Sequence, residues 1–196
     1  VLEHRQDQYG NPVYIPEDAT VFDFKRRFVS YKRPLMPFED ISILRRILEE
    51  NNAHYILTGK VHQGDTEMRT RLNQVLKLID SDDLLRERVH YIQDYDEELG
   101  FALAAGSDIA INNPIVGLEA CGTSFMKDIA NLKVLISTAD GGVADLSPIA
   151  CLEIVGASYE AEVGLCMSKC YEQLESSKMT LGTKVKSIAN YLGIYR

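Results

Sequence analysis

Short runs of β-branched and aromatic residues alternate with longer segments of helical periodicity along most of this 196-residue chain. Short apolar runs bounded by turn residues are typical of buried strands, and apolar residues spaced three and four apart are typical of amphipathic helices. Such alternation favours right-handed βαβ units and an open, mostly parallel sheet. Strands are predicted at Thr20–Phe24, His54–Gly59, Arg88–Gln93, Asp108–Asn112, Lys133–Ser137 and Leu152–Gly156.

Three apolar stripes predict the helices between these strands. The first follows the capping-type residues Glu39 and Asp40, and the third follows the acidic run DYDEE, whose charges favour a helix N-terminus. The tail adds two further helical patterns. We therefore predict a Rossmann-like, doubly wound parallel α/β domain over residues 20–196, with an appended C-terminal helix and an irregular lead-in over residues 1–19. The stripes are Ile41, Leu44, Ile47 and Leu48; Met68, Leu72, Val75, Leu76 and Ile79; and Leu99 with Leu103; the tail patterns are Tyr159–Glu175 and Thr183–Tyr195.

Charge and composition exclude several classes of protein. The net charge of −8 argues against a nucleic-acid surface, which needs a dominant basic patch. No stretch approaches the roughly 18 consecutive apolar residues of a membrane span. The four cysteines follow no metal-ligand spacing, so we expect no metal site and a reducing, cytoplasmic location. Because the chain begins with Val rather than Met, we expect a segment of a longer protein.

Ligands of open parallel sheets bind beyond the carboxyl ends of the strands. The loops that follow the predicted strands carry the least ordinary residues of the chain, in KRRFVSYKR, KVHQGD, DYDEE, NPIVGLEACGTS and TADGG. Plain turns explain KVHQGD and TADGG equally well, and His62 alone is a weak sign of acid–base or metal chemistry. The coincidence of unusual loops at one edge nevertheless predicts a functional cleft there.

The first loop concentrates positive charge in an otherwise acidic chain. Lys25, Arg26, Arg27, Lys32 and Arg33 lie within nine residues, directly after a predicted strand. Arginine offers a planar fork of donors and lysine a compact charge, so the loop is suited to hold a phosphate group. A solvated basic loop is an equally good interpretation of this stretch alone.

The stretch LEACGTSFMKD places an acid, a Cys-Gly-Thr-Ser turn and a lysine behind a predicted strand. If the turn opens a helix, its free N–H groups face an anion. Lys127 lies about one turn into that helix, where a partly desolvated amine could attack an aldehyde. A lysine that simply points to water is the commoner alternative. Cys121 as a nucleophile is disfavoured because no histidine partner is evident nearby.

Taken together, these stretches resemble the α-glucan (glycogen, starch and maltodextrin) phosphorylases, in particular their shorter archaeal and bacterial branch. The family signature E-A-S-G-T-x-x-M-K corresponds to Glu119–Lys127, and its phosphate loop K-R-x-x-x-Y-K-R corresponds to Arg26–Arg33. GKVHQGD, QDYDEEL and INNPIVGLEA are similar to further family segments. Asn131, Thr138, Asp140 and Gly141 fall in register with the family's N-G…G-T-x-D-G.

The resemblance implies a role for each matched position. Lys127 would carry pyridoxal 5′-phosphate, whose phosphate acts as a proton relay beside inorganic phosphate. The implied cofactor contacts are the backbone amides of Thr123 and Ser124, the side chain of Arg26, and Tyr95 packed near the ring. The remaining implied residues contact substrates: Arg27 and Lys32 would bind the substrate phosphate, and Glu119, Cys121 and Gly122 would bind hydroxyl groups of the glucosyl unit.

The implied activity is retaining phosphorolysis of an α-1,4-glucan or maltodextrin, with inorganic phosphate, to glucose 1-phosphate. The implied fold is one lobe of the two-lobed GT-B architecture, so the partners include an N-terminal lobe of the same protein, and a homo-oligomer is left open. An isolated lobe is expected to be inert. Departures from the family pattern include Cys121 for the commoner serine, Arg26 for lysine, and Val29, Phe125, Asp128 and Leu132.

Two other functions remain open from the residues. A glycogen- or starch-synthase-like nucleotide-sugar glycosyltransferase shares the lobe fold and an E-x-x-G turn, but it has no need for a lysine at position 127. A degenerate lobe that only binds glucan or a partner protein is the non-enzymatic alternative. Cofactor labelling at Lys127 would separate the first alternative from a phosphorylase, and formation of glucose 1-phosphate by the full-length protein would separate the second.

Overall fold

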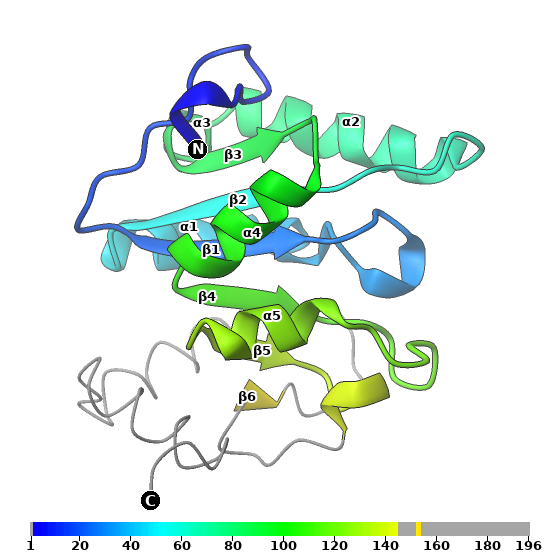
Figure 1. The fold of residues 1–196 in the computed structure, drawn as a ribbon. Coiled ribbons are helices and arrows are strands. Elements are labelled where there is room, and N and C mark those ends of the chain that lie inside the picture. Colours follow the sequence, from blue (N-terminus) through cyan, green and yellow to red (C-terminus); the bar gives the residue numbers. More distant parts are fainter. Residues whose placement is uncertain (1, 145–151, 154–196) are drawn as a thin grey trace, which may run out of the picture.

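A computed structural model describes residues 2–144 and 152–153 of the chain as a six-stranded, all-parallel sheet covered by helices on both faces (Figure 1). The strand order is β3-β2-β1-β4-β5-β6, so the direction of winding reverses between β1 and β4. The predicted α/β class and all six predicted strands are confirmed. The strands are β1 (Thr20–Lys25), β2 (Ala53–Thr58), β3 (Val89–Ile92), β4 (Ile109–Asn112), β5 (Val134–Ser137) and β6 (Leu152–Glu153).

Helices begin where the sequence supplies an aspartate cap. The side chains of Asp40, Asp65, Asp82 and Asp96 each accept a hydrogen bond from the backbone N–H three residues ahead. The three predicted stripes lie on α1, α2 and α4, whereas the short α3 and the 3₁₀ turns were not predicted. The helices are α1 (Ile41–Glu50), α2 (Thr66–Asp80), α3 (Asp83–Arg88), α4 (Glu97–Gly106) and α5 (Ser124–Ala130), with 3₁₀ helices η1 (Leu2–His4), η2 (Ser30–Lys32), η3 (Met36–Phe38) and η4 (Gly141–Val143). Both predicted tail helices lie outside the described residues.

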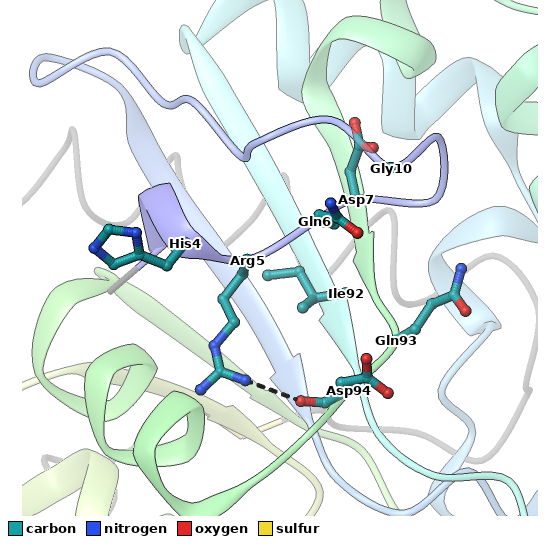
Figure 2. A pocket seen from close by; sticks show the side chains of 8 residues that line it. All are labelled: His4, Arg5, Gln6, Asp7, Gly10, Ile92, Gln93 and Asp94. Atoms are coloured by element: carbon teal, nitrogen blue, oxygen red, sulfur yellow. Dashed lines mark hydrogen bonds between the residues drawn. The ribbon is translucent and has the colours of Figure 1, made fainter.

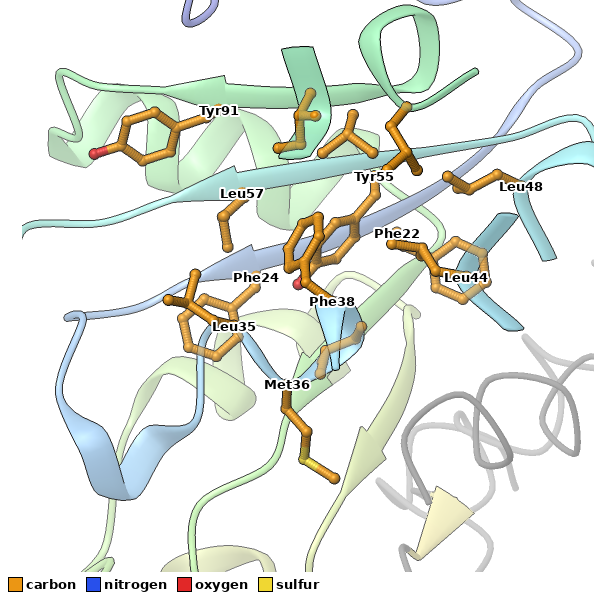
Figure 3. Close-up of a cluster of buried hydrophobic side chains, with 14 of the residues drawn as sticks. Phe22, Phe24, Leu35, Met36, Phe38, Leu44, Leu48, Tyr55, Leu57 and Tyr91 are labelled. Atoms are coloured by element: carbon orange, nitrogen blue, oxygen red, sulfur yellow. The ribbon is translucent and has the colours of Figure 1, made fainter. Parts of the chain in front are cut away.

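The main core fills one face of the sheet, between the strands and α1, α2 and α3. Phe22, Phe24, Tyr55 and Leu57 point to this face because side chains alternate along a strand (Figure 3). Val21 and Ile56 point to the other face, where Leu99 of α4 covers them. The same alternation places Asp23 and Lys25 on the α4 face, a polar interruption of an apolar surface.

The lead-in segment packs along β3, which is one of the two edge strands of the described sheet. The Gln8 side chain donates to the carbonyl of Val89 at 3.0 Å and accepts from the backbone N–H of Tyr91 at 2.7 Å. Arg5 donates to the carbonyl oxygen of Asp94 at 3.3 Å and pairs with Asp96 at 2.8 Å. This contact protects an exposed sheet edge from pairing with another chain. Within the described residues, no helix is long and apolar enough to span a membrane.

Candidate functional site

The carboxyl ends of β1 and β4 lie side by side at the switch point of the sheet, and the loops that follow them are joined directly. The backbone N–H of Ile115 donates to the carbonyl of Tyr31 at 2.7 Å. Arg33 donates from Nε to the carbonyl of Asn113 at 2.6 Å, and Asn113 donates back to the carbonyl of Arg33 at 3.2 Å. The basic loop and the loop that leads to α5 therefore form one wall.

A glycine at the end of β2 shapes the start of the basic loop. Gly59 has φ +157°, and a Cβ built there would lie 1.9 Å from the carbonyl oxygen of Arg26. Only glycine permits this approach. The stretch GKVHQGD thus contributes to the site through its backbone, because Gly59 allows the carbonyl group of Arg26 to pack closely against the chain at the end of β2.

Arg26, Lys32 and Glu119 form what we call the open cluster. The Lys32 ammonium lies 3.0 Å from Oε2 of Glu119 and donates to Oε1 at 3.2 Å. Nη1 of Arg26 lies 3.9 Å from Oε2 of the same carboxylate, beyond hydrogen-bond range. The side chains are only 6%, 9% and 8% exposed, yet Nη1 of Arg26 has no hydrogen-bond partner among the described residues, and Oε2 of Glu119 has the ion pair with Lys32 but no well-directed hydrogen bond.

Charge in the open cluster is not balanced. Two cations face one carboxylate, so the group carries a net charge of about +1 in a site with little water. Burial lowers the pKa of the Arg26 guanidinium, and Glu119 is the nearest charge that opposes this shift. Because buried polar atoms are nearly always hydrogen-bonded, the unpartnered guanidinium nitrogen of Arg26 indicates a place for a ligand.

The turn that carries Glu119 is fixed by the loop after β5. Asp140 accepts from the backbone N–H of Glu119 at 2.8 Å, and the N–H of Gly142 donates to the carbonyl of Cys121 at 2.9 Å. Gly122 has φ +70° and packs against the Glu119 side chain. Gly141 has φ +53° and fits below the carbonyls of Glu119 and Cys121. The residues Asp140 and Gly141 therefore support the site without belonging to it.

Asp23, Lys25, Ser107, Asp128 and Lys133 form a second buried group, which we call the closed network. Lys25 pairs with Asp23 at 3.0 Å and with Asp128, and Lys133 pairs with Asp23 and lies 3.3 Å from Asp128. Ser107 donates to Asp23, and Lys133 donates to Ser107 at 2.5 Å. The two lysines balance the two aspartates, and the network ties β1 to α5 and to the start of β5.

Burial and charge act against each other in the closed network. Burial opposes the charge of Asp23, but Lys25 and Lys133 outweigh it and lower the pKa of this carboxyl. Burial likewise opposes the charge of Lys25, and Asp23 and Asp128 outweigh it to raise the lysine pKa. For Lys133 burial prevails, so its pKa is lowered. The whole group is internally satisfied and offers no free atom to a ligand.

Lys127 lies on the outer side of α5. Its side chain is exposed, and Nζ lies 4.2 Å from the ring centroid of Phe101 on α4, which is itself exposed. Of the two interpretations that the sequence left open, the described conformation agrees with the lysine that points to water, because the side chain packs across one exposed ring and remains in solvent. Within the described residues no carboxylate pairs with this amine, in contrast to the amines of Lys25 and Lys133.

The other predicted residues divide between buried and exposed positions. The structure brings Arg26, Lys32 and Glu119 together, with Gly122 against Glu119. Tyr95 is half-buried beside Gly100, and burial raises the pKa of its hydroxyl while the nearby Lys25 partly offsets this. The side chains of Arg27, Cys121 and Thr123 are exposed, and Ser124 begins α5 in a partly buried position. The described conformation does not bring the Lys127 amine into the open cluster.

Sequence reasoning missed the closed network. One signal was available, because the strand pattern F-D-F-K puts an acid and a lysine two residues apart on one face. Their partners Asp128 and Lys133 are 103 and 110 residues away in sequence, so no local pattern could identify them. Asp128 is one of the departures from the family pattern, and its ion pairs with Lys25 and Lys133 give this departure a structural role.

A separate polar pocket of about 260 Å³ lies between the lead-in and the end of β3 (Figure 2). Arg5, Asp7, Gln93 and Asp94 contribute to its lining, and Figure 2 shows Arg5 directed at Asp94. Arg5 is already committed to the acids that hold the lead-in, and Asp7 accepts from the backbone of Tyr9 and Asn11. We assign this pocket no ligand.

Comparison with known proteins places the site in context. A family profile described as carbohydrate phosphorylase matches residues 11–186. The chain is 33% identical over 131 residues to a glycogen phosphorylase of Aquifex aeolicus. The matched region covers 66% of this chain and 19% of the relative. The chain is also 33% identical over 145 residues to a maltodextrin phosphorylase of Thermococcus litoralis, covering 71% and 17% respectively. The chain thus spans about a fifth of the length of these relatives.

Solved structures support the fold. A glycosyltransferase from Rickettsia africae superposes with a TM-score of 0.64 at 20% identity, covering 90% of this chain and 44% of that one. A UDP-forming α,α-trehalose-phosphate synthase from Burkholderia xenovorans superposes with a TM-score of 0.66 at 12% identity, covering 90% and 40%. These neighbours are GT-B glycosyltransferases, so the described residues form a Rossmann-like lobe of the GT-B type.

Proposed function

The chain belongs to the carbohydrate phosphorylase family, and from this premise we propose that it forms the C-terminal, cofactor- and phosphate-binding lobe of an α-glucan phosphorylase. The proposed reaction is retaining phosphorolysis of an α-1,4-glucan or maltodextrin to glucose 1-phosphate. The observation that carries this proposal is the open cluster, where two buried cations face the single carboxylate of Glu119 and Nη1 of Arg26 has no hydrogen-bond partner.

Phosphate is the first ligand that these residues suit. Arg26 and Lys32 are cations held at the carboxyl edge of the sheet, where the net charge of the cluster favours an anion. We assign Lys32 and the exposed Arg27 to the substrate phosphate, since an exposed guanidinium can turn toward a ligand that enters from solvent. Charge that develops on the phosphate during transfer is stabilised by these fixed cations.

The residues present also fit pyridoxal 5′-phosphate. Lys127 has an accessible primary amine with no carboxylate partner among the described residues, and Arg26 has a buried donor without an acceptor. Tyr95 is neutral and half-buried next to the closed network. Lys127 would hold the cofactor covalently, while Arg26 and the backbone amides of Thr123 and Ser124 would hold its phosphate. When bound, this group supplies a second phosphate that relays protons beside the substrate phosphate.

The glycosyl unit would bind on the turn before α5. Oε2 of Glu119 has no well-directed hydrogen bond and can accept one from a sugar hydroxyl, and Gly122 keeps the surface beside it free of a side chain. Cys121 is exposed at the same turn and would contribute through its backbone. In this assignment the chain's own groups orient the sugar next to the phosphate cations.

The proposed partner is an N-terminal lobe that completes the cleft. Relatives that are about five times longer than the matched region have room for such a lobe. Because the two walls together would exclude water and orient the glucan, we expect the present chain by itself to be inert. We further propose that the protein acts in the cytoplasm.

Borohydride reduction tests the cofactor assignment. The protein would be incubated with pyridoxal 5′-phosphate, reduced and mapped by peptide mass spectrometry. We expect label on Lys127, none on Lys25 or Lys133, and loss of label in Lys127→Ala. In the full-length protein, maltodextrin and phosphate should yield glucose 1-phosphate, and Lys127→Ala should abolish this activity.

Two outcomes would contradict the proposal. Absence of label on Lys127 together with tight binding of a nucleoside diphosphate would favour a nucleotide-sugar glycosyltransferase. Absence of glucose 1-phosphate formation, with no effect of Lys127→Ala, would favour a lobe that only binds glucan. In either case the cationic cluster would need another ligand.

A further inference from the structure

The open cluster contains its own anion. Glu119 places its carboxylate between the two cations, at 3.0 Å from the Lys32 ammonium and 3.9 Å from Arg26. The contact with Lys32 is one that an oxygen of the substrate phosphate would make, because Lys32 is assigned to that phosphate. The carboxylate therefore stands where the proposed substrate anion needs to be.

Glu119 and a phosphate cannot both hold Lys32 in this geometry. Two charges of the same sign a few ångströms apart repel strongly in a site with little water, and the second charge of a phosphate dianion increases this repulsion. The two anions would also have to divide the hydrogen bonds of the single Lys32 ammonium group between them. Binding of a phosphate therefore requires the carboxylate to turn away from Lys32.

The surrounding backbone allows only the side chain to move. Asp140 fixes the N–H of Glu119, and the contacts between Arg33 and Asn113 fix the loop that carries Lys32. Gly122 has no side chain, and its backbone faces the Glu119 carboxylate. The Glu119 carboxylate already lies beside this turn, since a Cβ built at Gly122 would be 2.9 Å from its Oε1. Rotation of the side chain away from Lys32 is thus the available response, and it keeps the carboxylate at the turn, on the proposed sugar side of the site.

We propose that Glu119 is an internal counter-ion that competes with the substrate anion for Lys32, so that anion binding releases its carboxylate to accept a hydrogen bond from a glycosyl hydroxyl. This inference rests on the proposed function for the identity of the ligands. It assigns Glu119 two alternative partners, and it couples the two binding events: phosphate should strengthen sugar binding, and sugar should strengthen phosphate binding by the same factor.

Titration with inorganic phosphate, without cofactor or sugar, tests the competition. Isothermal calorimetry should show that Glu119→Gln binds phosphate about tenfold more tightly than the wild type, because the competing charge is removed. Glu119→Asp keeps the net charge but shortens the side chain, so a gain of about threefold is expected from the weakened contact with Lys32. Glu49→Gln, an exposed acid on α1, is the matched control and should leave the affinity unchanged.

The result that overturns the inference is unchanged or weaker phosphate binding in both Glu119 variants, including no binding in either. Circular dichroism of each variant separates misfolding from loss of affinity, and Glu119→Asp serves if Glu119→Gln does not fold. A parallel titration with uridine diphosphate identifies the source of the anion. If the Glu119 variants bind only uridine diphosphate more tightly, the counter-ion role of Glu119 is supported, and the assignment of the site to phosphorolysis is contradicted. Pyridoxal labelling at Lys127 is independent of these titrations, so the two proposals can fail separately.

Discussion

The adjacent residues Lys25 and Arg26 enter two buried charged groups that differ in completeness. Lys25 belongs to the closed network, where two lysines and two aspartates neutralise each other and Ser107 adds hydrogen bonds. Arg26 belongs to the open cluster, where two cations share one carboxylate and the buried Nη1 of Arg26 has no hydrogen-bond partner. The closed network holds β1 against α5, whereas the open cluster retains unsatisfied groups that a ligand can bind.

This difference suggests how burial of charge serves two purposes within one loop. A buried ion that has all its partners contributes to the specificity of the fold but cannot bind anything else. A buried ion that lacks a partner reduces stability, and such strain is common at functional sites. Substitutions in the two groups should therefore change stability in different directions.

The largest effect is expected from Asp23→Ala in the closed network. Removing this carboxylate leaves Lys133 and Lys25 to share Asp128, with one uncompensated buried positive charge. The free energy of unfolding should fall by about 3–5 kcal/mol, as for other broken buried pairs. Urea denaturation of the variant measures this loss, and Glu49→Ala on the surface of α1 should change stability by less than about 0.5 kcal/mol. A loss below about 1 kcal/mol for Asp23→Ala would remove the distinction between the two groups.

A smaller effect is expected from pH, at a third buried polar group. His54 and His90 stack with Nδ1 and Nε2 3.0 Å apart, and burial lowers the pKa of His90 to about 4, with the neighbouring His54 adding to the shift. Between pH 6.5 and about 4 the unfolded chain binds a proton at His90 that the folded chain does not. Stability is therefore complete above pH 6.5 and falls by up to about 3 kcal/mol as the pH decreases to 4.

Denaturation at a series of pH values checks this expectation. His90→Phe keeps a flat ring in the stack but cannot titrate, so its stability should depend less on pH over the same range. An equal slope in the variant and the wild type would show that other groups dominate. This histidine pair is buried and polar but uncharged, so its effect on stability can be compared with the effects of the two buried charged groups.

The smallest effect on stability, and the one of opposite sign, is expected from Arg26→Met. The substitution removes a buried cation with an unpartnered nitrogen and leaves the Lys32–Glu119 pair neutral. Thermal unfolding should show a stability that is unchanged or raised by up to about 1 kcal/mol. In the absence of cofactor, inorganic phosphate should bind more weakly to the same variant, because the open cluster loses one of its two cations and with it the net positive charge. Destabilisation comparable to that of Asp23→Ala would mean that Arg26 has a structural role.

Periodicity in the amino-acid sequence was sufficient to predict the parallel α/β fold and the edge of the sheet at which the candidate site forms. Periodicity specifies strands and helices because it reports which side of each element is buried, and the parallel arrangement then gathers every strand-to-helix loop at one edge. For this reason the basic loop and the turn at Glu119 could be assigned to the same cleft before their contacts were known. The family motifs added expected roles for individual residues, including Lys127 and Tyr95.

The pairing of the charges depends on three-dimensional packing and could not be predicted from local sequence patterns. Lys32 meets Glu119 across 87 residues of sequence, Lys25 meets Asp128 across 103, and Lys127 lies over Phe101 on a neighbouring helix. The pairing of a charge depends on distances of a few ångströms between elements that are remote in the chain, and periodicity carries no such information. The sequence therefore indicated which residues reach the cleft, and the packing of β1, α4 and α5 determined which of them are closed into a network and which remain open to a ligand.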